Sequence, residues 1–279
     1  MAGALYLCAT PIGNLDDLSA RALRTLETVD LIAAEDTRRT LTLLNHFGIH
    51  KPLTSYYEHN KAEKGQALLA KLQEGQNIAL VTDAGTPAIS DPGEDLVRLC
   101  IENGITVVPV PGCCAMVNAL IASGLPTGRF CFEGFLSVTK KSRKEHLDAL
   151  KNETRTMIFY EAPHKLLNTL TDFYKAFGDR RITLAREMTK KFEEFVYTTL
   201  SEAIARYTET PPKGEFVLVL EGKTESDEPK VLSDDELRKQ VAALRTQGCS
   251  LSEAAKTVAE ANGLKKREVY SLCLEEDGK

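Results

Sequence analysis

The segment that most constrains this chain is 81–93, VTDAGTPAISDPG, in which two glycines and two prolines impose an irregular backbone. It follows an apolar run rich in strand formers at 77–81 and precedes residues 94–100, which have helical spacing. The segment is therefore predicted to lie where a buried strand ends and a helix begins, the place where open α/β sheets bind ligands. An ordinary strand-to-helix turn is the alternative, although such turns are usually shorter.

The same arrangement occurs twice more. An apolar run at 4–9 ends in the turn 10–14, and a run at 105–110 ends in the turn 111–115, each followed by a helical pattern. Carboxyl ends of parallel strands share one edge of a sheet, so the three turns are expected to lie together. These features predict an α/β domain over residues 1–122. The motifs GxGxxG and GxxxxGK[ST] are absent, which disfavours dinucleotide oxidoreductases and P-loop NTPases.

The remainder of the chain predicts a second α/β domain and a helical tail. After a Gly- and Pro-containing hinge at 123–128, strand patterns at 156–160, 181–185, 192–197 and 214–221 alternate with helical patterns at 143–151, 163–177 and 201–207. This domain, 123–222, is expected to contain strands in mixed directions. A charged linker at 222–230 leads to the tail, 231–279, which is either a helix-turn-helix module that contacts nucleic acid or a plain helical cap.

Composition narrows the class of protein. A chain that is 43% hydrophobic and 27% charged has the balance of a soluble globular protein. It has no apolar run of the roughly 18 residues that span a bilayer, and no N-terminal signal region, so we expect a cytoplasmic protein without membrane contact. Seven scattered cysteines without ligand spacing predict reduced thiols and no metal site. The net charge of −5 argues against a generally basic nucleic-acid surface, but leaves room for local basic patches.

Three polar clusters are candidates for substrate contact. The segment 35–40 holds acids beside arginines, 53–61 gathers Tyr, His, Asn and Lys, and 140–144 is the densest basic run. Each has a structural alternative. The first can cap a helix through Asp36 or Thr37, the second can be a solvated connector, and the third a solvated helix start.

Several motifs together resemble one known family. AEDTR at 34–38, DAGTPAISDPG at 83–93, GFL at 134–136, YEAPH at 160–164 and AREMTK at 185–190 are similar to the ribosomal RNA small-subunit methyltransferase I family of the tetrapyrrole-methylase superfamily. The resemblance covers residues 4–222 almost continuously and the tail more loosely. Ser137 departs from the proline that usually follows GFL. The resemblance implies two α/β domains with S-adenosylmethionine in the cleft between them, a homodimer, and methylation of a cytidine ribose 2′-oxygen in 16S rRNA of the small ribosomal subunit.

The resemblance also implies which residues contact the cofactor. They come from the three turns of the first domain and from two positions of the second: Pro11, Gly13, Asp83, Gly85, Pro87, Pro111, Gly112, Cys113, Cys114, Ala115, Ala162 and Gly214. Glycine and proline turns offer main-chain groups to a ligand. Asp83 can face the sulfonium or, alternatively, cap its own loop.

Catalytic and RNA-binding residues are predicted less directly. A ribose hydroxyl is a poor nucleophile, and a base would accelerate its attack by roughly 10²–10⁴-fold. Glu187 is the first candidate for that base, with Glu161 and Asp36 after it, and Lys190 can stabilise a developing alkoxide. Each can equally be an internal salt-bridge partner. The residues predicted to contact RNA are Arg38, Arg39, His59, Lys140, Lys141, Arg143 and Lys144, and after them 265–267 in the tail.

Three other functions compete with this prediction. The same fold hosts methyltransferases that act on small tetrapyrroles, for which the helical tail has no evident use. A regulatory module that binds S-adenosylmethionine without turnover is a second alternative. A dinucleotide oxidoreductase is the third, and the missing glycine fingerprint disfavours it.

Overall fold

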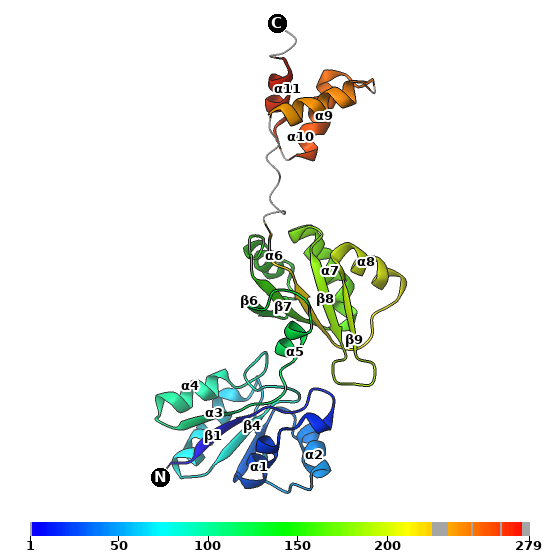
Figure 1. The fold of residues 1–279 in the computed structure, drawn as a ribbon. Coiled ribbons are helices and arrows are strands. Elements are labelled where there is room, and N and C mark those ends of the chain that lie inside the picture. The colour runs from blue at the N-terminus through cyan, green and yellow to red at the C-terminus, as the bar shows by residue number, and fades with distance from the viewer. Residues whose placement is uncertain (1, 225–233, 247, 263, 275–279) are drawn as a thin grey trace. The chain divides into compact units, whose positions relative to one another are not determined.

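The computed structural model of the chain describes residues 2–224, 234–246, 248–262 and 264–274. The chain divides into two compact units, 1–223 and 224–279, which Figure 1 shows in colours from blue to red along the sequence. Residues 225–230 of the predicted linker and residues 231–233, 247, 263 and 275–279 of the predicted tail lie outside the described residues. Along the described part of the chain, each helix is too short or too polar to cross a bilayer.

The first sheet is entirely parallel. Its strands have the order β3-β2-β4-β1-β5, with bounds β1 Ala4–Cys8, β2 Leu31–Ala34, β3 Leu53–Ser55, β4 Ile78–Val81 and β5 Thr106–Val110. Strands β2 and β4 are buried along their whole length, as expected for a parallel sheet covered on both faces. The α/β prediction for this part of the chain is confirmed. The short edge strand β3 lies in a segment for which the sequence predicted only a loop.

Helices cover both faces of this sheet. Helices α1 (Ala20–Thr28) and α2 (Thr37–His46) pack on one face through Leu26 and Leu44, while α3 (Lys61–Gln73) and α4 (Glu94–Glu102) pack on the other through Leu72 and Leu96 (Figure 1). Ser19 caps α1 by accepting a hydrogen bond from the Ala22 amide. A short 3₁₀ turn, η1 (Leu15–Asp17), precedes it.

The three turns that follow β1, β4 and β5 lie at one edge of the sheet, as predicted. In the strand order, β1 is flanked by β4 and β5, and all three run parallel, so their carboxyl ends are adjacent. The turns also bond to one another. Thr10 and Gly85 exchange two main-chain hydrogen bonds of 2.8 and 3.0 Å, and the Thr86 hydroxyl donates to the Cys113 carbonyl at 2.8 Å.

The second sheet has mixed strand directions, as predicted. Its order is β6-β7-β10-β8-β9, with bounds β6 Phe130–Gly134, β7 Thr156–Glu161, β8 Arg181–Arg186, β9 Glu194–Thr199 and β10 Phe216–Leu220. Strands β6 and β7 pair in parallel, and the other neighbours pair antiparallel.

One face of the second sheet is covered by α6 (Lys140–Ala149), α7 (Pro163–Phe177) and α8 (Leu200–Glu209), around a core that includes Phe159, Phe173 and Leu218. The other face contacts α5 (Ala115–Ile121) through Ala119 and Leu120. Helix α5 therefore packs on the second sheet, although its residues fall within the predicted first domain. The domain limits drawn from the sequence stay predictions.

The second unit is a small helical module. Helices α9 (Asp234–Thr246), α10 (Leu251–Ala261) and α11 (Lys266–Leu274) share a core that contains Leu237, Val241, Ala255, Val258 and Val269. A capping box formed by Ser250 and Glu253 begins α10.

Neighbouring positions on α7 provide a stability test. Phe173 is fully buried, with its ring centroid 4.7 Å from that of Phe159, whereas Tyr174 is 43% exposed. We expect Phe173→Ala to lower the free energy of unfolding by about 3–5 kcal/mol because it leaves a cavity in the core. The control Tyr174→Ala should change it by about 0.5 kcal/mol or less. Urea denaturation followed by circular dichroism measures both, and equal losses would show that α7 is not packed as described.

Candidate active site

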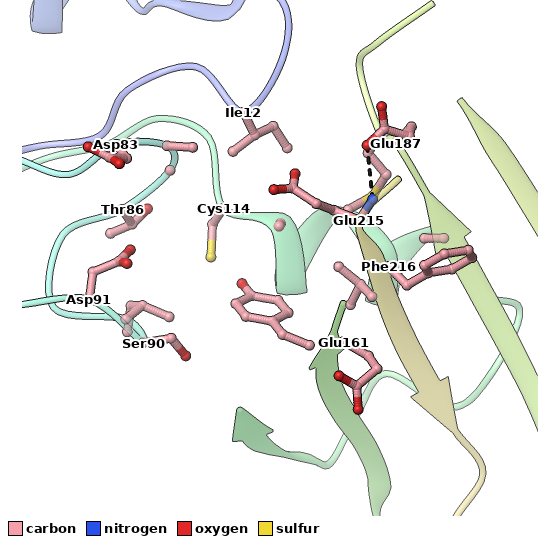
Figure 2. A pocket seen from close by; sticks show the side chains of 18 of the residues that line it. Ile12, Asp83, Thr86, Ser90, Asp91, Cys114, Glu161, Glu187, Glu215 and Phe216 are labelled. Atoms are coloured by element: carbon pink, nitrogen blue, oxygen red, sulfur yellow. Dashed lines mark hydrogen bonds between the residues drawn. The ribbon is translucent and has the colours of Figure 1, made fainter. Parts of the chain in front are cut away.

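A cavity of about 320 Å³ lies between the turns of the first sheet and the second sheet (Figure 2). This volume is within the range of small-molecule sites. We call it the cleft pocket. It is lined by Ile12, Arg39, Asp83, Ala84, Gly85, Thr86, Ile89, Ser90, Asp91, Cys114, Ala115, Phe135, Tyr160, Glu161, Ala162, Ala185, Glu187, Met188, Lys190, Glu215, Phe216 and Val217.

The loop after β4 forms one wall of the cleft pocket. Gly85 has a φ of +87°, a conformation that glycine adopts without steric cost. Ala88 and Ser90 also have positive φ values, of 67° and 62°, which are costly for residues with a side chain. The fold holds this loop in an unfavourable backbone conformation, and strain of this kind is typical of ligand-binding loops.

Two carboxylates of this loop face the cavity, Asp83 and Asp91 (Figure 2). Asp83 pairs with Arg39 at 3.1 Å and accepts a hydrogen bond from the Asp36 amide at 3.1 Å. Burial raises the pKa of Asp91 to about 6, opposed by a hydrogen bond from Thr82 and assisted by the negative charges of Glu35 and Asp83. Burial and Glu35 likewise raise the pKa of Asp83. The wall therefore concentrates negative charge and favours a ligand with a positive group.

The opposite wall carries an ionic cluster from the second sheet. Lys190 Nζ lies 2.9 Å from Glu187 Oε1 and 2.9 Å from Glu215 Oε2, and the Glu215 amide donates to Glu187 Oε1 at 2.9 Å (Figure 2). The hydrogen bond from the Glu215 amide, followed by that from Lys190, lowers the pKa of Glu187. Burial opposes ionisation of Lys190, but its hydrogen bonds to Glu215 and Glu187 raise its pKa. Both side chains are charged at neutral pH.

Two glycines make room for this ionic cluster. A Cβ atom on Gly13 would lie 2.4 Å from Lys190 Cγ, and one on Gly214 would lie 2.3 Å from Glu187 Cγ. Neither glycine lines the cleft pocket. Their small size lets Glu187 and Lys190 pack against the chain at the pocket wall.

Glu161 is the most enclosed of the carboxylates considered. It is 5% exposed, and its two oxygens accept hydrogen bonds from its neighbour's amide, Ala162 N, at 2.9 Å and from the Thr169 hydroxyl at 2.5 Å. Arg143 Nη2 in turn donates to Thr169 Oγ1 at 2.8 Å. This hydrogen-bonded chain joins the end of β7 to α6 and α7.

Asp36, a further candidate for the base, is the N-cap of α2. Its carboxylate accepts from the Arg38 amide at 2.9 Å and pairs with the Arg38 guanidinium at 2.7 Å. These hydrogen bonds hold the pKa of Asp36 below its ordinary value. Asp36 therefore has the helix-capping role that the sequence analysis gave as the alternative to substrate contact.

The apolar part of the cleft pocket comes from both sheets. Tyr160 packs edge-to-face on Phe135 with 5.6 Å between ring centroids, and its hydroxyl accepts a hydrogen bond from the Met116 amide at 3.2 Å. Burial raises the pKa of Tyr160 to about 12. Val217 and Phe216 of β10 add further apolar surface. A flat, partly apolar ligand fits this side of the cavity, and a cation fits the side of Asp83 and Asp91.

The structure brings part of the predicted cofactor set into the lining. Asp83, Gly85, Cys114, Ala115 and Ala162 line the cleft pocket, as do the predicted catalytic residues Glu187, Lys190 and Glu161. The other predicted cofactor residues belong to the same turns or to the second domain and do not line the cleft pocket: Pro11, Gly13, Pro87, Pro111, Gly112, Cys113 and Gly214. Gly112, for example, packs against Ala9, to which an added Cβ would come within 2.9 Å.

Several lining residues were missed although they belong to the quoted motifs. Ser90 and Asp91 end the 83–93 loop, Phe135 is the central residue of GFL, and Tyr160 begins YEAPH. Their position in the sequence could have identified them, because each one follows or ends a strand. Arg39, predicted to contact RNA, lines the cleft pocket beside Asp83.

His59 and the basic run 140–144, also predicted to contact RNA, lie outside the cleft pocket. Exposed His59 precedes α3, and its ring lies near that of Tyr57, with centroids 6.3 Å apart. Lys140, Lys141, Arg143 and Lys144 are in the first turns of α6. Lys141 and Lys144 pair with the acids four residues later, Glu145 and Asp148, while Arg143 turns inward toward Asp172. The basic run is therefore more neutralised than its sequence suggests.

Comparisons with known proteins agree with this fold. Residues 4–204 match the family model described as Tetrapyrrole (Corrin/Porphyrin) Methylases. A solved structure of uroporphyrin-III C-methyltransferase from Thermus thermophilus, complexed with S-adenosyl homocysteine, superposes with a TM-score of 0.55 at 19% identity, covering 78% of this chain and 97% of that one. At this identity the likeness shows the fold.

Closer relatives match over almost the whole length. A protein of Synechocystis sp. named ribosomal RNA small subunit methyltransferase I is 54% identical over 98% of both chains. The protein of the same name from Escherichia coli O157:H7 is 50% identical over 99% of this chain and 96% of that one. The chain therefore belongs to the ribosomal RNA small subunit methyltransferase I family, within the tetrapyrrole (corrin/porphyrin) methylases.

Proposed function

We propose that this chain transfers the methyl group of S-adenosylmethionine to the ribose 2′-oxygen of a cytidine in 16S rRNA of the small ribosomal subunit. The observation that carries the proposal is the cleft pocket itself. It joins the three turns of the first sheet to the second sheet, and its lining combines two carboxylates, an ionic cluster and an apolar surface. The names of the relatives supply the substrate class, and the family resemblance supplies the cytidine and the 2′-oxygen.

The residues of the cleft pocket fit this cofactor. S-adenosylmethionine supplies an electrophilic methyl group on a sulfonium, and it also carries an ammonium group. Asp83 and Asp91 would hold these positive groups, and main-chain groups near Gly85 and Cys114 would hold the polar ends. Phe216, Val217 and Met188 would contact the adenine.

Catalysis would depend mainly on orientation, because methyl transfer requires an in-line approach of the nucleophile. Lys190 is held at the cavity wall by Glu187 and Glu215 and keeps its charge there. A cation at this place would stabilise the oxygen as its proton leaves. The sequence ranks Glu187 first as the acceptor of that proton, with Glu161 after it, but the lowered pKa of Glu187 makes it a weak proton acceptor.

We expect the protein to label small subunits that lack the modification when tritiated S-adenosylmethionine is supplied. The label should resist alkali and lie at a single cytidine, because a 2′-O-methyl group blocks cleavage of the adjacent bond. Naked 16S rRNA and a small tetrapyrrole are the parallel substrates. Label on a base, or transfer to the tetrapyrrole alone, would contradict the proposal. Cofactor binding without any transfer would favour a regulatory module.

Asp91→Asn should weaken cofactor binding and alter its pH dependence. With a pKa of about 6, the carboxyl of the unmodified chain ionises as pH rises through 6, so affinity for a cationic ligand should rise over that interval. The variant should bind more weakly above pH 6 and lose this rise. Isothermal titration calorimetry at pH 5 to 8 measures it, with the exposed Glu74→Gln as control.

The same variant has an opposite expected effect on stability. The folded chain ionises Asp91 less readily than the unfolded chain, so this group lowers the free energy of unfolding as pH rises from about 4 to about 6. Asp91→Asn removes that loss and should be more stable than the parent protein above pH 6. In the calorimetric titration, a variant that binds the cofactor as tightly as the parent protein at pH 7 would exclude Asp91 from the cofactor site.

Glu187→Gln tests the candidate base. The ionised carboxylate already accepts two hydrogen bonds and its pKa is lowered, so it is a weak proton acceptor. We therefore expect kcat to fall by less than the roughly 10²–10⁴-fold that loss of a general base brings. A fall within that range, with cofactor affinity unchanged, would instead establish Glu187 as the base. Glu209→Gln, exposed at the end of α8, is the matched control.

A further inference from the structure

A second cavity, of about 380 Å³, is formed by α6, α7 and the segment that precedes α6. It is lined by Ser137, Val138, Arg143, Lys165, Asn168, Thr171, Asp172 and Lys175. We call it the α6–α7 groove. Lys165 and Lys175 follow one another along α7, and neither was among the residues predicted to contact RNA.

The α6–α7 groove is positively charged. Asp172 is the one carboxylate of its lining, and Arg143 neutralises it through an ion pair of 2.7 Å. Lys165 and Lys175 have no ion pair within the described part of the chain. Two positive charges therefore remain uncompensated, together with the amide of Asn168 and the hydroxyl of Ser137 as hydrogen-bonding groups.

One chain segment separates this groove from the cleft pocket. Phe135 lines the cleft pocket, while Ser137 and Val138, two and three residues later, line the groove. Phe135 is 56% exposed and Val138 75% exposed, so the segment presents apolar surface beside both cavities. The segment thus offers a ring on which a base can stack, next to cations that can bind a phosphate.

The two cavities also share hydrogen-bonded partners. Glu161 lines the cleft pocket and accepts from Thr169, and Arg143 donates to the same hydroxyl while it lines the groove. Thr169 is 1% exposed. The position of the groove relative to the cleft pocket is therefore fixed by buried polar contacts as well as by packing.

We propose that the α6–α7 groove binds the phosphodiester backbone of the RNA next to the nucleotide whose ribose enters the cleft pocket, with Phe135 stacking on a base between them. The inference rests on the proposed function and adds the residues that hold the substrate. Lysines are suited to phosphate oxygens, which accept without a fixed geometry, and aromatic side chains stack on unpaired bases. An acidic protein could also bind the two lysines, but it has no nucleobase that could stack on Phe135.

The test is the full chain with Lys165→Ala and Lys175→Ala together, in filter binding to small subunits at several salt concentrations. We expect weaker binding, and a slope of log K against log[salt] that is less steep by about 0.7 for each phosphate that the variant no longer neutralises. The KM for subunits should rise by a larger factor than kcat falls. Lys165→Arg with Lys175→Arg keeps both charges and should restore the slope.

The matched control is Lys64→Ala with Lys71→Ala, two lysines seven residues apart on α3 that line neither cavity. It should leave affinity and slope as in the parent protein. If the groove variant behaves like this control, with unchanged circular dichroism, the groove does not contact the substrate. If it loses affinity for subunits but not for naked 16S rRNA, the partner is a protein and the RNA assignment is wrong.

Failure of the proposed function would look different. A parent protein that binds subunits but transfers no methyl group would overturn the 2′-O-methylation proposal. The salt dependence of binding would still decide whether the groove holds RNA. Phe135→Ala adds a second readout, and we expect it to lower affinity for single-stranded substrate with no change in the salt slope, because stacking involves no ion release.

Discussion

The pair of main-chain hydrogen bonds between Thr10 and Gly85 is the contact on which the site depends. It ties the turn after β1 to the loop after β4, and the Thr10 hydroxyl adds a third bond to the Thr82 carbonyl at 3.1 Å. Thr10 and Thr82 are almost fully buried, so water competes little for these bonds. From this anchor the loop continues to Asp91, and the Thr86 bond to Cys113 attaches the turn after β5.

The facing wall is held by different means. The chain after β8 has positive φ values at Glu187 and Thr189, 48° and 66°, in residues that carry side chains. The hydrogen bonds among Glu187, Lys190 and Glu215 offset the cost of that backbone, and two glycines provide the space. A charged pair with its partners in place is already oriented, so little reorganisation is needed when charge develops in the cavity.

The arrangement of the first sheet followed from the sequence because each strand is a short apolar run that ends in a Gly- or Pro-containing turn. The predicted bounds 163–177 agree with those of α7, whereas β3 was missed because its three half-buried residues carry no periodic signal. The sequence predicted which motifs lie at the site. It did not predict which of their residues line the cleft pocket and which support the lining residues. Gly13 and Gly214 lie in glycine-containing turns, which typically contact ligands. In the structure, however, the side chains of Lys190 and Glu187 pack against these two glycines.

The charges were harder still to predict, since a run of basic residues does not reveal which of them acids neutralise. Lys144 and Asp148 pair across one helical turn, and Arg143 reaches α7, which is distant in the sequence. Lys165 and Lys175 are separated in the sequence by ten positions and become neighbours of Arg143 only when α6 and α7 pack together. A pattern of this kind depends on tertiary structure, so local spacing does not contain it.

The parallel order of the first sheet has a consequence for biosynthesis. Strand β1 leaves the ribosome before both of its partners, β4, which pairs through Ile78 with Leu5, and β5, which pairs through Thr106 with Ala4. Closing such long loops costs chain entropy before the contacts compensate for it, so sheets of this kind form slowly. The turn at 10–14 therefore cannot pack against both neighbouring turns until β5 and the turn after it have been synthesised. During translation the nascent chain holds one wall of the cleft pocket, and a ligand of this pocket can stabilise the fold only after both sheets exist.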